Sequence, residues 1–255
     1  MINTDNNFKS KFLYHYTKMD TLIEHILPSY KIKLNSLGNT NDPKEKMISI
    51  LHSIKNIGYA GEYLEISTRL HYYLDNDCRI CCFSSDYIEG NKEFKGYNLP
   101  RMWATYGDNH KGVCLKIDYD KFCQENEIDN EVRFISNVEY ATELNHNLIK
   151  TDKQFDNDYE KVTLQLIRDN LDKLFFLKHR DWNTEREIRY LSLKANSYCS
   201  IKGSIDSIIV GMDFKRRYLP SIITQMSPVT DIDKIEYDHK HGQLFLFKIK
   251  KINVA

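Results

Sequence analysis

The hydrophobic residues of the chain follow two different periods, and each period predicts a different kind of element. In the later half, apolar residues recur at steps of three and four, which predicts an amphipathic helix over about residues 159–177. Near the start, KIKLNS alternates Ile32 and Leu34 with polar residues, which is the period of a strand. The same two patterns predict strands at about residues 12–16, 31–36, 78–85, 112–118, 136–140, 186–193, 205–210, 232–237 and 244–250. Further helices are predicted at about residues 18–27, 44–57, 62–75 and 101–108, and between the strands at 205–210 and 232–237.

Proline and glycine mark the boundaries between these elements. Pro28 is predicted to end the first helix, and Pro43 is predicted to occupy the first position of the helix that follows the turn GNTND. EGNKEFKGYNLP, residues 89–100, is interpreted as a loop, and residues 121–156 are polar and poorly patterned outside the strand near 136–140. The intermixed order predicts a single α+β domain over residues 1–255, with a mixed or antiparallel split sheet and flanking helices.

The composition of the chain argues against several classes of protein. The 255 residues include 36 basic and 36 acidic side chains, so the chain lacks the overall positive field of a nucleic-acid-binding protein. It has no apolar run of about 18 residues, and its start, MINTDNNFKSKF, lacks the apolar core of a signal peptide. The six cysteines lack the paired spacing of a zinc site. We therefore expect a cytoplasmic protein with reduced cysteines, without a membrane segment or a bound metal.

The first candidate cluster is Tyr14-His15-Tyr16-Thr17 on the opening strand. Side chains alternate along a strand, so His15 and Thr17 share one face, and Tyr14 and Tyr16 share the other. Two interpretations stay open for the histidine. It either donates a hydrogen bond to a ligand hydroxyl, or it is a satisfied histidine of the core or the sheet edge.

The second and third candidate clusters contain small polar residues. Ser36, Asn41 and Asp42 lie in a loop that either covers a pocket or supplies helix-capping groups, with Asp42 as the predicted N-cap. Ser84 stands at the end of a buried strand, where loops and ligands often meet. No base lies near it in the sequence, so we do not interpret it as a nucleophile.

The fourth cluster is aromatic. Trp103 and Tyr106 are three residues apart, so they share one side of a helical turn. Such pairs are common in protein cores. The alternative is that they form a platform on which a flat heterocycle such as nicotinamide stacks.

The fifth cluster is a group of charged and aromatic residues just before and within a late strand. Its members are Lys178, Arg180, Trp182, Glu185, Glu187 and Arg189. In an extended chain, Glu185 and Glu187 project to the same face, with carboxylates about 7 Å apart. Their repulsion requires compensation by cations such as Arg186 and Arg189, or by a ligand. A solvated face of cross-strand salt bridges is the alternative.

In this order, the clusters resemble the family of domain of unknown function number 2971. The resemblance spans nearly the whole chain and is carried by YHYT (14–17), LNSLGNTNDP (34–43), CCFSS (81–85), MWATYGDNHKGVCLKID (102–118), KHRDWNTEREIRYL (178–191) and IDSIIVGMDF (205–214). Two departures are Ala104-Thr105, where serine and histidine are expected in many relatives, and Asn183-Thr184, which replaces a more aromatic pair. The family has no settled activity to transfer.

More remotely, the layout is similar to the ADP-ribosyltransferase superfamily. Its members carry a histidine on the opening strand, an aromatic residue or serine on a middle strand, and a late catalytic glutamate, often in a Glu-x-Glu pair. The resemblance implies that His15 is the first element, Ser84 or Tyr106 the second, and Glu185 with Glu187 the third. It implies an ADP-ribosyltransferase-like fold and either an NAD-dependent ADP-ribosyltransferase or an NAD glycohydrolase, in a toxin or an anti-phage defence effector.

The resemblance also implies roles around bound NAD, which is the substrate. Glu187 bonds a ribose hydroxyl, Glu185 orients or deprotonates the acceptor, and His15 with Thr17 holds the other ribose. Trp103 or Tyr106 packs on the nicotinamide, and Arg189 or Lys178 meets the diphosphate. Further candidates for nucleotide contact are Tyr14, Tyr16, Ser36, Asn41, Asp42, Ser84 and Trp182. The acceptor is left open among protein, nucleic acid and water, as is the oligomeric state, and the alternative function is a non-catalytic module that binds a nucleotide or a partner.

Overall fold

Eight strands form one central sheet in the computed structural model, which describes residues 10–46, 60–143, 158–195, 198–226, 231–240 and 243–249. The strands are β1 (Phe12–Thr17), β3 (Arg79–Ser85), β6 (Val113–Asp118), β7 (Arg133–Asn137), β10 (Glu187–Ser192), β12 (Ile205–Val210), β13 (Asp231–Asp238) and β14 (Gln243–Ile249). Their order across the sheet is β14-β13-β12-β6-β1-β3-β10-β7. β12 and β13 are parallel, and the other neighbours are antiparallel. A mixed sheet with flanking helices confirms the predicted α+β class.

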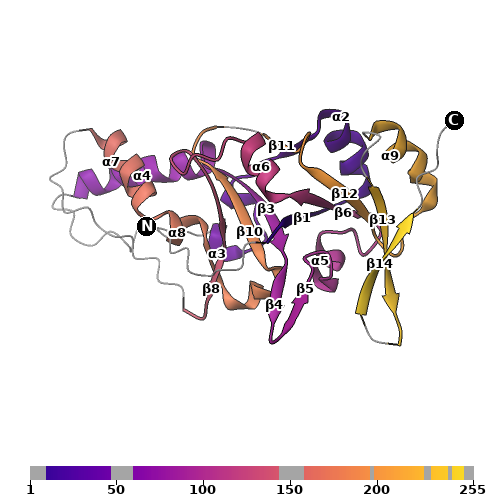
Figure 1. Cartoon of the computed structure of the whole chain (residues 1–255). Helices are drawn as coiled ribbons and strands as arrows, with labels where there is room; N and C mark the ends of the chain where they lie inside the picture. The colour runs from indigo at the N-terminus through magenta and orange to yellow at the C-terminus, as the bar shows by residue number, and fades with distance from the viewer. Residues whose placement is uncertain are drawn as a thin grey trace.

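Within the described residues, three two-stranded sheets lie outside the central sheet. They pair β2 (Lys31–Lys33) with β11 (Tyr198–Ser200), β4 (Tyr87–Glu89) with β5 (Lys92–Phe94), and β8 (Glu139–Ala141) with β9 (Leu177–His179). β4 and β5 fall partly in the stretch interpreted as a loop. That prediction was wrong because Gly90, at φ 60°, provides the tight turn of a short hairpin. In Figure 1 this hairpin projects below the central sheet.

Helices gather at the two ends of the central sheet (Figure 1). At one end are α4 (Ala60–Asn76), α7 (Tyr159–Asp169) and α8 (Leu171–Phe175), whose Leu70, Ile167 and Phe175 pack with Ile80 and Leu191 of the sheet. The other helical elements are α1 (Met19–Thr21), α2 (Leu27–Ser29), α3 (Pro43–Lys46), α5 (Pro100–Thr105), α6 (Tyr119–Glu125) and α9 (Leu219–Gln225), the π-helix η1 (Leu22–Ile26), and the 3-10 helices η2 (Leu37–Asn39), η4 (Arg180–Glu185) and η5 (Arg216–Tyr218). Within the described ranges, none of the helices has the length and apolar character needed to cross a membrane.

Two predicted helices end or break at different places from those expected. The first continues past Pro28 to Ser29, because the π-helix η1 precedes the proline and changes the bonding pattern of that turn. The helix predicted over 159–177 is divided at Asn170, whose Nδ2 donates to Leu166 O at 2.9 Å. This side chain competes with the helical backbone bonds. Most of the helix predicted over 44–57 lies outside the described residues.

α6 was not predicted, although it lies at the edge of the stretch that lacked a clear pattern. Asp118 is its N-cap and accepts a hydrogen bond from Lys121 N at 3.0 Å. Its Phe122 is fully buried in the core on one face of the sheet. A good cap and one large apolar anchor therefore suffice for a helix of two turns.

The central sheet divides between β1 and β3. These strands share only the pairs Leu13↔Ser85 and Tyr14↔Ser84, whereas β1 pairs with β6 along its whole length. Beyond Tyr14, a side-chain contact replaces the backbone pairing. His15 Nδ1 lies 3.1 Å from the carbonyl oxygen of Cys82 on β3. Farther along β3, Ile80 pairs with Asn35 through backbone hydrogen bonds of 2.8 and 2.9 Å. The separating strands thus leave a space that is closed at its far end by the segment around Asn35.

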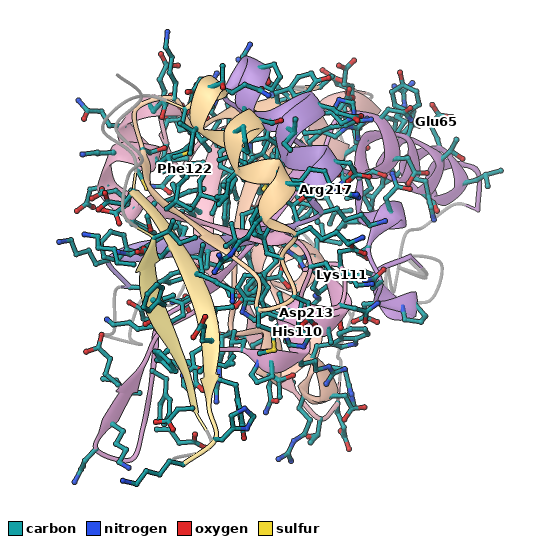
Figure 2. The ribbon with its side chains drawn as sticks, turned by 90° about the vertical axis from the view of Figure 1, so that its right-hand side faces the viewer. Glu65, His110, Lys111, Phe122, Asp213 and Arg217 are labelled. Carbon is teal, nitrogen blue, oxygen red and sulfur yellow. The ribbon has the colours of Figure 1, made fainter. Side chains whose placement is uncertain are left out.

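A left-handed turn follows α5 and leads into β6. Its residues Asp108, Asn109 and His110 have φ values of 50°, 48° and 66°. Non-glycine residues in this region cost on the order of 1 kcal/mol each. Neighbouring backbone holds the turn in place, with His110 N donating to Trp103 O at 3.2 Å and Asp213 N donating to His110 O at 3.0 Å. Figure 2 shows His110 and Asp213 next to each other, with Lys111 close by.

Candidate functional site

A pocket of about 200 Å³ lies between the separating parts of β1 and β3, and both strands line it. The segment from Lys33 to Asn41, α5, and the end of η4 with the start of β10 supply the other walls. Several predicted site residues meet here although they are distant in sequence. They are Tyr14, His15, Tyr16, Asn41, Tyr106, Lys178, Glu185 and Glu187.

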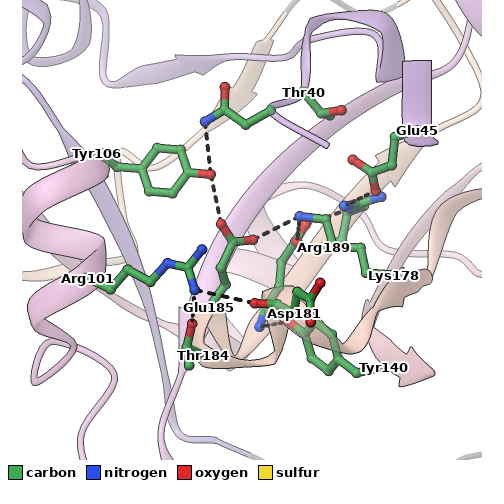
Figure 3. A network of polar contacts seen from close by, with 12 residues as sticks. Thr40, Glu45, Arg101, Tyr106, Tyr140, Lys178, Asp181, Thr184, Glu185 and Arg189 are labelled. Atoms are coloured by element: carbon green, nitrogen blue, oxygen red, sulfur yellow. Dashed lines mark hydrogen bonds and ion pairs between the residues drawn. The ribbon is translucent and has the colours of Figure 1, made fainter. Parts of the chain in front are cut away.

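The two late glutamates converge on one lysine. Lys178 Nζ lies 2.9 Å from Glu185 Oε2 and 2.7 Å from Glu187 Oε2 (Figure 3). The predicted reason for this convergence was wrong, because the two residues are not alternate positions of one strand. Glu185 ends η4, Arg186 adopts a left-handed conformation at φ 48°, and Glu187 begins β10. A turn therefore brings the carboxylates together.

Arg189 is a second cation of the same cluster and is fully buried. Its Nε lies 2.7 Å from Glu187 Oε1, and its second guanidinium arm lies 2.7 Å from Glu45 Oε1. It also donates to Phe175 O at 2.6 Å. We refer to Glu45, Glu185, Glu187, Lys178 and Arg189 as the carboxylate cluster. Three carboxylates and two cations leave this cluster with one formal negative charge in excess.

The cations hold Glu187 in its charged form. Burial by itself raises the pKa of Glu187, but the charges of Arg189 and Lys178 outweigh burial and lower this pKa to about 2. Burial likewise lowers the pKa of Lys178, and the charges of Glu187 and Glu45 raise it above its ordinary value. Both groups are therefore ionised at neutral pH. The backbone of Glu187 is fixed as well, because its N–H donates to the Tyr140 hydroxyl at 2.9 Å.

Glu185 is connected to the loop on the opposite wall. The hydroxyl of Tyr106 donates to Glu185 Oε1 at 2.8 Å, and Asn41 Nδ2 donates to the same hydroxyl at 3.1 Å (Figure 3). Burial, together with the charge of Glu185, raises the pKa of Tyr106, so the phenol stays protonated and remains a donor. One carboxylate oxygen of Glu185 therefore accepts a hydrogen bond from a neutral donor, and the other pairs with a cation.

His15 lines the pocket and is the candidate for contact with a ligand on β1. Desolvation lowers the pKa of His15, although the hydrogen bond to Cys82 O acts in the opposite direction. The ring is therefore neutral at pH 7, and its contact with a carbonyl requires the proton on Nδ1. Nε2 is then an acceptor. This corrects the expectation that His15 donates to a ligand hydroxyl, because the single ring proton, on Nδ1, is already donated to Cys82 O.

Trp103 and Arg189 do not line the pocket, in contrast to the roles expected for them. Trp103 is fully buried in the core, where its Nε1 donates to Tyr97 O at 2.8 Å and its ring meets Tyr16 edge-on at 5.1 Å. Of the two predicted aromatics, Tyr106 alone reaches the pocket. The guanidinium of Arg189 is occupied by two carboxylates and a carbonyl, so it has no free edge for a diphosphate.

The remaining predicted residues lie around the pocket without lining it. Thr17 ends β1, Asp42 is buried just before α3, and Ser36 precedes η2 without making a side-chain cap. Ser84 is fully buried on β3 and pairs with Tyr14 on one side and with Glu187 on the other.

Trp182 lies on η4, and its ring is near two cations. Arg101 stands 5.7 Å and Lys178 5.4 Å from its ring centre. Arg101 also donates to Asp181 O at 3.3 Å and to Thr184 Oγ1 at 3.2 Å, which ties α5 to η4 (Figure 3). The ring of Trp182 thus packs next to the ammonium group of Lys178.

Sequence reasoning missed several residues of the pocket. Lys33, Asn35, Asn39, Thr40, Cys82 and Met102 all line it. The amide-rich stretch LNSLGNTND was a signal for a polar wall, but the contact that positions it is the distant pair Asn35↔Ile80. Among the residues that the structure describes, no group of three or more histidine, cysteine or acidic side chains is arranged to hold a metal ion.

Comparison with known proteins finds one family model that matches the central part of the chain. Residues 102–190 match the model of a family described as protein of unknown function (DUF2971). This confirms the first predicted resemblance over that range, which includes Tyr106, Lys178, Glu185 and Glu187. No curated protein and no solved structure matches the chain.

Proposed function

We propose that the chain cleaves the nicotinamide–ribose bond of NAD, as an ADP-ribosyltransferase or an NAD glycohydrolase. One observation carries the proposal: His15 from the first strand and the carboxylates Glu185 and Glu187 from a late turn line one pocket with aromatic walls. A polar imidazole acceptor, aromatic faces and an anionic cluster are the groups that a cationic nicotinamide nucleoside requires.

The charge of the carboxylate cluster suits this reaction. Breaking the nicotinamide–ribose bond places positive charge on the ribose, as in glycoside cleavage. The cluster contains three carboxylates and two cations, so its excess negative charge is compensated as the ribose becomes positive. Fixed charges in a partly buried site are most effective when they meet charge that develops during the reaction. The cationic nicotinamide ring would also interact favourably with the face of Tyr106.

Individual roles follow from the contacts. Glu187, ionised and held by two cations, would face the ribose and stabilise the developing charge. Glu185 would orient or deprotonate the acceptor, with Tyr106 and Lys178 fixing its carboxylate. His15 Nε2 would accept a hydrogen bond from a ribose hydroxyl. The acceptor is protein, nucleic acid or water. With water, the reaction would deplete NAD, an outcome that suits a toxin or an anti-phage effector.

An ADP-ribosyltransferase-like fold is part of the proposal. It is supported by the division of the sheet between β1 and β3 and by the positions of the three expected elements around it. His15 lies on β1, Ser84 lies on β3, and Glu187 pairs with Ser84 across the next strand boundary. Thr17 ends the strand that carries His15, and the ring of Trp182 packs against Lys178, which lines the pocket.

The direct test is incubation of the purified protein with NAD, followed by mass spectrometry for free nicotinamide and for ADP-ribose, free or attached to protein. Glu187→Gln should abolish nicotinamide release. Glu139→Gln, at an exposed glutamate that does not line the pocket, is the matched control and should keep wild-type turnover.

Glu187 pairs with two buried cations, so the Glu187→Gln variant loses these ion pairs and with them stability. Its nicotinamide release must therefore be compared with that of the wild type below the melting temperature of the variant, after circular dichroism has confirmed the fold. Nicotinamide release by a folded Glu187→Gln variant at the wild-type rate would refute the role of this carboxylate. Absence of both NAD binding and product in the wild type would refute the proposed function.

A second candidate function is a non-catalytic module that binds a nucleotide. It is favoured by the full occupation of Glu187, whose two oxygens each face a cation at 2.7 Å, as in a static binding surface. This function predicts that NAD raises the melting temperature while no nicotinamide appears. The same two measurements therefore separate the two candidates.

A further inference from the structure

One end of the pocket offers a different chemistry from the carboxylate cluster. Two cations are found among the described pocket-lining residues, Lys33 and Lys178. Lys178 is buried and paired with Glu185 and Glu187, so its charge is already neutralised. Lys33 is exposed, and none of the described carboxylates forms an ion pair with it. Lys33 is therefore the cation that is available to an anionic group of a ligand.

The backbone that carries Lys33 is well fixed. Ile32, the preceding residue, is 3% exposed and packs in the core, and Lys33 pairs with Tyr198 across the small sheet of β2 and β11. Two residues later, Asn35 is joined to Ile80 of β3 by two backbone hydrogen bonds. Lys33 thus lies on an anchored strand, and only its flexible side chain must be ordered when a ligand binds.

Neutral hydrogen-bond donors surround this end of the pocket. Asn35 and Asn39 line the pocket together with Lys33, whereas the hydroxyl of Thr40, which also lines it, already donates to Leu37 O at 2.9 Å. An ammonium group with amide donors is a suitable environment for phosphate, whose oxygens are acceptors. The carboxylate cluster would repel the same phosphate, so an anionic group is directed away from Glu187 and toward Lys33.

The two ends are separated along β3. Glu187 pairs with Ser84, and Asn35 pairs with Ile80, four residues away. At about 3.3 Å per residue, this is roughly 13 Å between the two backbone positions, and the side chain of Glu187 reaches part of the way back, to Arg189 opposite Cys82. The pocket therefore has the carboxylates on one wall and the Lys33 ammonium on another, and it suits a ligand that carries a positive group and a phosphate at separate positions.

On the basis of the proposed function, we propose that Lys33 binds the phosphate next to the nicotinamide ribose, assisted by Asn35 and Asn39. The ligand class is then a pyridine nucleotide that carries a 5′-phosphate, in preference to the unphosphorylated nucleoside. Lys33 is a specificity-determining residue in this scheme, and no step of bond cleavage depends on it.

The test compares two probes that differ only in this phosphate, nicotinamide mononucleotide and nicotinamide riboside. Their affinities for the full chain are measured by calorimetry at low temperature. Wild type should bind the mononucleotide about tenfold more tightly than the riboside, the effect of one charge-assisted contact. Lys33→Gln should remove this difference, and Lys33→Glu should reverse it. Neither variant should change the affinity for the riboside by more than about twofold.

Lys31→Glu is the matched control, because Lys31 is exposed on the same face of β2 but does not line the pocket. It makes the same change in net charge and should leave both affinities at the wild-type value. If Lys33→Glu binds both probes as wild type does, or if Lys31→Glu weakens the mononucleotide equally, the assignment of Lys33 is wrong while the proposed function stands. If wild type binds neither probe nor NAD, both the proposed function and this inference are overturned.

Discussion

Replacing Arg189 with methionine tests how the carboxylate cluster is held together. Methionine fills much of the same volume without charge. The substitution removes the cation that lies 2.7 Å from both Glu187 and Glu45, and it removes the donor to Phe175 O. Lys178 would then be the remaining cation of the cluster, facing three carboxylates. We expect Arg189→Met to be strongly destabilising.

The magnitude follows from burial. Removing one partner of a buried ion pair costs about 3–5 kcal/mol, because the other partner is left buried and uncompensated. For a chain of this size, about 2–4 °C of melting temperature corresponds to 1 kcal/mol, so the melting temperature should fall by roughly 6–20 °C. Arg133→Met is the control. Arg133 pairs with Glu127, whose side chain is 78% exposed, and such surface pairs contribute about 1 kcal/mol or less.

The assay is thermal and urea denaturation monitored by circular dichroism, at neutral pH and constant ionic strength. A second variant, Arg189→Met with Glu45→Gln, removes one of the stranded carboxylates and should recover part of the lost stability. The reasoning is refuted if Arg189→Met and Arg133→Met unfold at the same midpoint. It is also refuted if removing the Glu45 charge from the Arg189→Met background brings no recovery.

Two further predictions concern pH and backbone packing. Although burial opposes it, Arg189 and Lys178 lower the pKa of Glu187 to about 2, so its stabilising effect is complete above the ordinary pKa of 4.5 and is lost as pH falls from there toward 2. Melting temperatures measured from about pH 6 to about pH 3 should therefore fall less in Glu187→Gln than in wild type. Gly211→Ala should cost about 1–3 kcal/mol in denaturation experiments, because its Cβ would clash with His110 O, whereas Gly38→Ala, with its nearest atom at 3.8 Å, should cost less.

The elements that the sequence predicted well are those in which one local pattern dominates. The strand predicted at 205–210 coincides with β12, because the β-branched residues Ile208, Ile209 and Val210 follow one another directly. The helix predicted over 159–177 has the right face, but its break at Asn170 depends on a side chain that bonds its own backbone. The pattern of apolar residues carries no information about whether the Asn170 side chain makes this hydrogen bond.

The candidate site was predictable in its residue types and less so in its contacts. His15, Glu185 and Glu187 were expected to meet, and they line one pocket. The burial of Arg189 was not foreseeable, because one of its counter-ions, Glu45, comes from a helix far away in the sequence. Lys33 was missed for the same reason, since only pairing with distant strands brings it to the pocket.

Because two residue pairs join β1 to β3, the central sheet consists of two plates, β14 to β1 and β3 to β7, that meet along a short seam. One plate carries His15, and the other carries Glu187 and the segment bonded to Ile80. Both plates pack against one shared core, which joins Leu13 of β1 and Phe83 of β3 with Phe122 of α6. Substitutions in this core should therefore change the width of the gap and the affinity for a ligand, without altering any atom that the ligand touches.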